Sequence, residues 1–112
     1  MNYDIRFPEK RLAKIEKDAL EVLRYDLEEL RIRYESDQEK VHIGVFFSAL
    51  RTGYCINKIR EQNAKMNKID LPTKQLLDVI YNIYNSKIYD VLSQYEILMK
   101  FILSDSYLNY KI

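Results

Sequence analysis

The stretch LAKIEKDALEVLRYDLEELRIRY, residues 12–34, decides the fold because its apolar residues recur three or four positions apart. Charged side chains fill the positions between them, as expected for a helix with one buried face. Pro8 suits the first turn of such a helix. The pattern therefore predicts an amphipathic helix over residues 9–35. We expect its buried face to consist of Leu12, Ile15, Ala19, Val22, Leu23, Leu27, Leu30 and Tyr34.

A second helix is predicted over residues 38–64, after the polar run ESDQEK interrupts the first pattern. Ser36 and Glu39 have the spacing of a capping box, which would start this helix. Its apolar residues lie densely enough to be buried on two sides, so we expect it at the centre of the fold. Gly44 and Gly53 each cost about 1 kcal/mol relative to alanine inside a helix. Close approach of a neighbouring helix would offset that cost.

Two shorter helices are predicted in the C-terminal half, over residues 72–85 and 87–103. Asp70 or Thr73 can cap the third helix, with Pro72 in its first turn. Asn85 and Ser86 favour caps and turns, so the break is placed there. Short connections between amphipathic helices favour antiparallel neighbours. The prediction is a single all-α domain, an antiparallel four-helix bundle with two long and two shorter helices and an aromatic tail over residues 104–112.

Composition and isolated reactive residues argue against catalysis. The net charge of the 112-residue chain is +1, which is not the excess typical of a nucleic-acid binder. His42 is the only histidine and Cys55 the only cysteine. We interpret His42 as a residue near a helix N-terminus and Cys55 as a small core residue. Acidic residues such as Glu16 alternate with bases at helical spacing and are expected on a solvated face. No catalytic residue, metal ligand or cofactor is predicted.

Tyrosines supply the candidate binding residues. Tyr84 and Tyr95 fall on the apolar stripes and are expected in the core, with their hydroxyls reaching its rim. The other aromatic and apolar candidates lie off these stripes or in the tail, where they would form a partner surface or cover the bundle. These candidates are Tyr81, Tyr89, Tyr107, Leu108 and Tyr110.

A local excess of bases surrounds the second connection between helices. Such a cluster could contact an anionic lipid surface at about 1 kcal/mol per base, or it could be an ordinary solvated loop. The bases singled out as membrane-proximal are Lys58, Arg60, Lys65 and Lys68. The N-terminal sequence lacks the basic-then-apolar order of a secretory signal. We therefore expect a cytoplasmic protein, and a contact of this cluster with lipid would place it at the inner face of the membrane.

The layout resembles the immunity proteins of pediocin-like (class II) bacteriocins, and most closely their carnobacteriocin-type members. The segments that carry the resemblance are ALEVLRYDLEEL, VFFSALRTGYCINKIR, LPTKQLLDVIYNIY and the tyrosine-bearing LSQYEILMKFILSDSYLNY. The resemblance implies a cytoplasmic four-helix bundle that blocks pore formation without catalysis. Its partner would be the bacteriocin-engaged membrane receptor, the mannose phosphotransferase permease. The third and fourth helices and the tail would choose the toxin.

Two other functions remain open at the level of sequence. A small helical regulatory or assembly protein of phage or plasmid origin would dimerise, or bind another protein, through the tyrosine-rich face. A nucleic-acid binder would use the basic connection. No helix-turn-helix spacing with its short glycine turn supports the second alternative, so nucleic acid is not an expected partner.

Overall fold

A computed structural model describes residues 9–62, 67–86 and 90–104, and these residues form four helices. They are α1 (Glu9–Ser36), α2 (Ile43–Gln62), α3 (Leu71–Asn85) and α4 (Val91–Ile102). Two are long and two are shorter, and the described residues contain no strand, so the predicted all-α fold class is confirmed. The predicted tail lies almost wholly outside the described residues.

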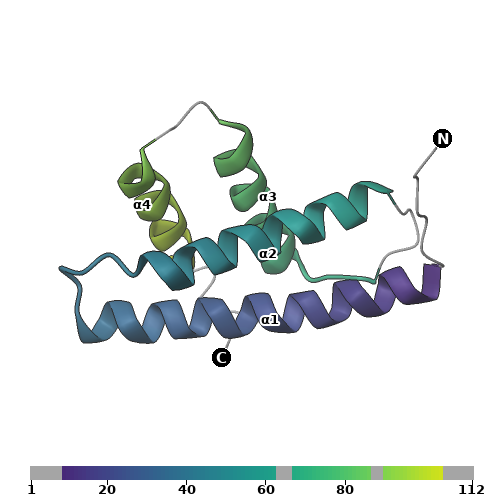
Figure 1. The fold of residues 1–112 in the computed structure, drawn as a ribbon, viewed down its shortest axis with the longest axis horizontal. Coiled ribbons are helices and arrows are strands. Elements are labelled where there is room, and N and C mark those ends of the chain that lie inside the picture. The colour runs from purple at the N-terminus through teal and green to yellow at the C-terminus, as the bar shows by residue number, and fades with distance from the viewer. Residues whose placement is uncertain (1–8, 63–66, 87–89, 105–112) are drawn as a thin grey trace.

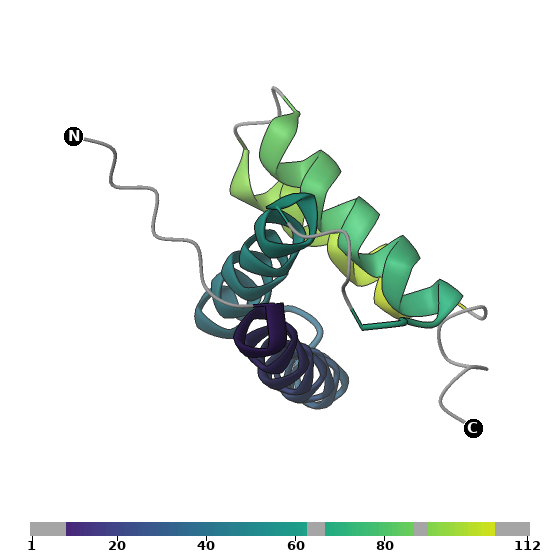
Figure 2. The same cartoon turned by 90° about the vertical axis from the view of Figure 1, so that its right-hand side faces the viewer.

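The helices pair as two antiparallel hairpins. The helices α1 and α2 lie side by side along the long axis, and the α3–α4 hairpin is set across α2 (Figures 1 and 2). The helix α2 packs against α1 on one side and against α3 on the other, which confirms its predicted central place. An edge-to-face contact between Phe46 and Tyr95, with ring centroids 5.4 Å apart, joins α2 to α4. The core therefore lies where the two hairpins cross.

The buried face of α1 is rotated from the predicted one. Leu20, Leu23, Leu27 and Leu30 are buried, whereas Ile15 and Val22 of the predicted face are exposed. At 100° per residue, the four leucines share one side of the helix with Glu16. Glu16 is fully buried, so its predicted place on a solvated face is wrong. The physical reason is a cationic partner on α2, described below.

The connection between α1 and α2 differs from the predicted capping box. The Ser36 hydroxyl donates back to the Ile32 carbonyl oxygen at 3.0 Å, so Ser36 belongs to α1. The Asp37 side chain accepts from the Glu39 backbone N–H at 3.2 Å, which forms a local turn. The helix α2 consequently starts at Ile43, five residues later than predicted, and His42 lies directly before it. The capping-box prediction is wrong because a nearer acceptor takes the Glu39 amide.

The predicted signals around α3 are confirmed. The Asp70 carboxylate accepts from the Thr73 backbone N–H at 2.8 Å, and Pro72 lies in the first turn. The helix ends at Asn85, with Ser86 as its C-cap residue. Asp90 caps α4 in the same way and receives the Leu92 N–H at 3.2 Å. Since Asp90 has an extended backbone, α4 begins at Val91 and not at the predicted residue 87.

Gly53 allows α2 and α3 to approach, as predicted, whereas Gly44 does not serve this purpose. A Cβ atom at Gly53 would lie 2.5 Å from Cδ1 of the buried Ile80. A Cβ atom at Gly44 would meet nothing within 4 Å. Cys55, two positions from Gly53, is exposed, so its interpretation as a core residue is wrong. It lies on the outer side of α2.

Gly53→Ala is expected to destabilise the protein by about 1 kcal/mol. Overpacking of a core costs about 1–3 kcal/mol, and the gain in helix propensity returns up to about 1 kcal/mol. Chemical denaturation followed by circular dichroism measures the change. Ile80→Val removes the clashing Cδ1 atom and should cost less in the Gly53→Ala background than in the wild type. Gly44→Ala is the matched control, and it should leave stability unchanged or raise it by about 0.5 kcal/mol.

Candidate functional site

A buried ion pair fixes the end of the α1–α2 hairpin that leads into α3. The Arg60 Nη1 atom donates to Glu16 Oε2 at 2.7 Å and to the Asn67 carbonyl oxygen at 3.1 Å. The Asn67 side-chain amide in turn donates to the Ala13 carbonyl oxygen at 2.7 Å. This network, which we call the Glu16–Arg60 tie, connects α1, the C-terminal turn of α2 and the segment before α3. It orients the residues that follow on α3.

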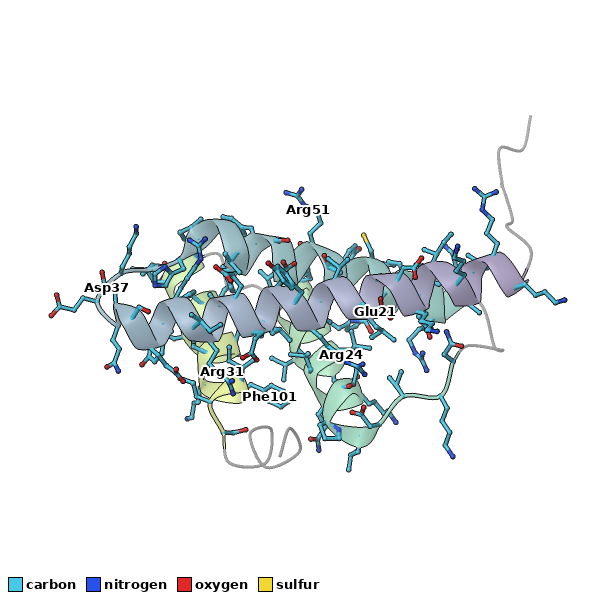
Figure 3. All side chains as sticks on the ribbon, turned by 90° about the horizontal axis from the view of Figure 1, so that it is seen from below. Glu21, Arg24, Arg31, Asp37, Arg51 and Phe101 are labelled. Atoms are coloured by element: carbon cyan, nitrogen blue, oxygen red, sulfur yellow. The ribbon has the colours of Figure 1, made fainter. Side chains whose placement is uncertain are left out.

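A second, more exposed contact supports the same arrangement. Arg24 Nη2 lies 3.7 Å from Oδ2 of Asp70, the residue that caps α3. Figure 3, with α1 in front, places Arg24 and Arg31 on the side of α1 that faces α3 and α4. The start of α3 is therefore held against α1 by charge as well as by the core. Both contacts help to place α3 next to α2.

An aromatic pair lies at the surface where α2 and α3 meet. The rings of Tyr54 and Tyr84 are tilted against each other with centroids 4.4 Å apart, and the Lys58 Nζ atom lies 5.3 Å from the Tyr54 ring centroid. Tyr84 is exposed and Tyr54 is partly exposed. We call Tyr54, Lys58 and Tyr84 the aromatic surface. Its two rings and its cation suit contact with a protein partner.

The surroundings of Tyr84 and Lys58 raise the pKa of both groups. Burial raises the pKa of Tyr84, and the positive charge of Arg51 opposes this shift to a smaller extent. The pKa of Lys58 is raised, first by its hydrogen bond to Glu61 and then by the charge of that carboxylate. Neither group changes its charge near neutral pH.

A cleft of about 340 Å³ continues the aromatic surface along α2 and α3. The Asn57 side-chain amide donates to the Leu77 carbonyl oxygen at 2.8 Å across it, which ties the two helices together. Its charged lining is balanced between two cations and two carboxylates, and Tyr81 stands among them. The lining residues are Asn57, Arg60, Glu61, Ile69, Lys74, Leu77, Asp78 and Tyr81. Such a mixed cleft can accept a polar or aromatic side chain of a partner.

A second cleft, of about 400 Å³, lies between α4 and the α1–α2 turn. Its lining is mixed, since apolar residues such as Leu92 and Met99 stand beside Gln38, Glu96 and Lys100. The Tyr95 hydroxyl is buried there, and among the described residues it has no hydrogen-bond partner. Burial raises the pKa of Tyr95, and the nearby His42 backbone acts in the opposite direction. The predicted core position of Tyr95 is confirmed, while Tyr84, predicted alongside it, is exposed.

The structure brings together only part of the predicted binding set. Tyr81 lies in the first cleft, one helical turn from Tyr84. Lys58 is paired with Glu61 at 3.4 Å, and Lys68 is exposed. Arg60 departs from its interpretation as a membrane-proximal base because the buried Glu16 carboxylate holds its guanidinium. The remaining predicted residues, Lys65, Tyr89, Tyr107, Leu108 and Tyr110, lie outside the described residues.

Sequence reasoning missed the Tyr54–Tyr84 pair. Tyr84 is predicted in the core, and Tyr54 follows Phe47 and Leu50 at helical spacing, so the spacing alone indicates burial of both. The signal in the sequence was that Tyr54 directly follows Gly53. A glycine at which two helices come close brings the large residues next to it on both helices within contact distance. The two rings lie on the consecutive helices α2 and α3, and the way these helices pack decides whether the rings meet.

Comparison of the chain with protein-family models, curated proteins and solved structures finds no match. Among the described residues, no group of three or more histidine, cysteine, aspartate or glutamate side chains is placed to hold a metal ion. In the same part of the chain, none of the helices combines the length and apolar character needed to cross a bilayer.

Proposed function

We propose that the protein is a bacteriocin immunity protein of the pediocin-like type, which protects a cell by binding and without catalysis. In this proposal it acts from the cytosol on the bacteriocin-engaged membrane receptor, the mannose phosphotransferase permease, and prevents pore formation. The observation that carries the proposal is the aromatic surface, which adjoins the cleft containing Tyr81 on a scaffold of two crossed hairpins. The proposed partner comes from the resemblance of the sequence layout to the immunity proteins.

Physical reasoning supports binding by this surface. Tyrosine rings give a large contact area and lose little conformational entropy, so they are frequent hot-spot residues of interfaces. The contact between Tyr54 and Tyr84 restricts both rings before a partner arrives. Lys58 adds a positive charge beside them, which suits a site close to the inner membrane surface. The tail, with Tyr107, Leu108 and Tyr110, would extend the contact and select the toxin.

Tyr84→Ala is expected to weaken protection. Loss of a hot-spot ring costs about 2 kcal/mol of binding, which corresponds to about a thirtyfold loss of affinity. The measurement is the minimal inhibitory concentration of a panel of pediocin-like peptides against a sensitive strain that expresses each variant. Wild-type protein should raise this concentration for at least one peptide, and Tyr84→Ala should raise it far less.

Leu71→Ala is the matched control, because Leu71 is also exposed on α3 but belongs neither to the aromatic surface nor to the cleft lining. It should protect as the wild type does. Circular dichroism verifies that all variants remain helical. Unchanged killing of cells that express the wild type, by every peptide of the panel, would reject the proposed function.

A second candidate function is favoured by a separate observation. The longest helix of the described chain, α1, leaves four large apolar residues exposed. They are Ile15, Val22, Tyr25 and Ile32. This favours a small regulatory or assembly protein of phage or plasmid origin that works by association. A protein of this kind would associate without any membrane receptor.

A further inference from the structure

The outer side of α2 continues the aromatic surface with an exposed ring and an exposed guanidinium. Phe47, Arg51, Tyr54 and Lys58 follow one another at spacings of four, three and four residues. At 100° per residue, these side chains fall within an arc of about 60° on one side of the helix. Phe47 is 39% exposed, Arg51 is exposed, and Figure 3 shows Arg51 pointing outward from α2. We call Phe47 and Arg51 the extension of the aromatic surface.

Arg51 brings a positive charge to this side of α2. Burial raises the pKa of Tyr84, and the charge of Arg51 opposes that rise, so the guanidinium lies near the Tyr84 ring. With the residues that the structure describes, Arg51 forms no hydrogen bond and no ion pair. Its donors are therefore available to an acceptor from outside the chain.

The carboxylates nearby are already engaged. Residues 41–60 contain no acid. Asp26 of α1 accepts from the Ser48 hydroxyl at 2.6 Å, and Glu61 pairs with Lys58 at 3.4 Å. Of the two cations on the stripe, Arg51 is therefore the one left to bind an anion.

We propose that the aromatic surface and its extension bind a short acidic and apolar segment of a protein partner. In this arrangement, which rests on the proposed function, a carboxylate of the segment accepts from the Arg51 guanidinium. An aromatic or aliphatic side chain beside that carboxylate lies on the rings of Phe47, Tyr54 and Tyr84. Arginine can hold a carboxylate through two parallel hydrogen bonds, which fix its direction as well as its charge. The acidic residue thus orients the partner segment on the rings.

An anionic lipid surface fits this side of α2 less well. Basic clusters that bind such lipids contain about 4–8 lysines or arginines. The stripe carries two, and one of them, Lys58, pairs with Glu61. A flat layer of headgroups would also meet the Glu61 carboxylate. A single side chain can reach Arg51 without meeting it, because Glu61 lies about 15 Å further along the helix.

Binding of synthetic peptides tests the inference without any bacteriocin. The probe is a fluorescein-labelled peptide in which glutamates alternate with phenylalanine and leucine, and its control carries a lysine in place of each glutamate. By fluorescence anisotropy, the full chain should bind the acidic peptide at least about tenfold more tightly than the control. Arg51→Glu sets two carboxylates against each other and should weaken binding of the acidic peptide by at least about tenfold. Lys14→Glu is the matched control, since it makes the same change of charge at an exposed residue of α1, and it should bind as the wild type does.

Ionic strength separates the charge contact from the apolar contact. Raising the salt concentration from about 50 to 500 mM should weaken the wild-type complex, because salt screens exposed charge pairs. The complex of Arg51→Gln should change little over the same range. Equal binding of the two peptides, or no binding of the acidic one, overturns the inference. So does an Arg51→Glu variant that binds the acidic peptide as the wild type does.

Lipid vesicles assign the source of the anion. In cosedimentation with vesicles of equal parts phosphatidylcholine and phosphatidylglycerol, the wild type should stay in the supernatant. If the wild type sediments with these vesicles and Arg51→Glu does not, the partner is a lipid surface, and the choice of a protein segment is overturned.

The protection assay separates this inference from the proposed function. Arg51→Glu should protect far less than the wild type, and Lys14→Glu should protect fully. If the wild type and Arg51→Glu protect equally, the proposed function stands and the inference is overturned. If the wild type protects against no peptide of the panel but binds the acidic probe through Arg51, the proposed function is rejected and the partner chemistry stands.

Discussion

Phe46→Ala is expected to lower the free energy of unfolding by about 4 kcal/mol, because removal of a buried aromatic ring leaves a cavity. Phe46 is fully buried on α2, and its ring contacts both Phe47 and Tyr95. The contact with Tyr95 also joins the two hairpins, so its loss weakens their crossing. Urea denaturation followed by circular dichroism at 222 nm measures the change.

Phe47→Ala is the matched control, since it removes the same ring from the next position of α2. Phe47 is 39% exposed, so most of the transfer free energy is absent. We expect a loss of about 1 kcal/mol or less. Equal losses for the two variants would contradict the burial of Phe46 and the exposure of Phe47 on α2.

Arg60→Ala is expected to lower the free energy of unfolding by about 3 kcal/mol, because it leaves the Glu16 carboxylate buried without a cation. Glu16 is 0% exposed, and within the described ranges its Oε1 atom has no hydrogen-bond partner. Its Oε2 atom accepts from Arg60 Nη1. The effect lies at the low end of the range for buried pairs because the Arg60 side chain is 28% exposed. Thermal and urea denaturation both report it.

Two comparisons separate this effect from a general loss of charge. Lys58→Ala breaks the exposed pair with Glu61 and should cost less than about 1 kcal/mol. The double substitution Glu16→Leu with Arg60→Met removes both charges and should recover most of the stability lost in Arg60→Ala. If Arg60→Ala costs no more than Lys58→Ala, the buried carboxylate is not what makes Arg60 important.

Local signals in the sequence predicted the helices well. Asp70 and Pro72 act within one turn of chain, and the break at Asn85 and Ser86 is equally local, so the structure confirms all of them. The predicted start of α2 was wrong because the Asp37 side chain competes with Ser36 for the Glu39 backbone N–H. Two local interactions of similar strength compete there, and spacing alone does not rank them.

Contacts between distant segments were out of reach of the same reasoning. The sequence predicts Glu16 on the surface, because its partner Arg60 lies 44 positions later in the chain and only the fold brings the two together. Ile15 and Val22 were predicted in the core because they have the same helical spacing as Leu20 and Leu23. The aromatic surface depends on how α3 is rotated against α2. That rotation points Ile80 at Gly53 and leaves Tyr84, one turn later, at the rim.

The missing side chain at position 53 also has an evolutionary consequence. A mutation that adds a methyl group there would cost least together with a smaller residue at position 80. The two positions should therefore change together over time, while the exposed residues drift independently. In diverged descendants of the same ancestor, a small residue opposite a bulky aliphatic one would remain as a sign of common descent after overall similarity is lost.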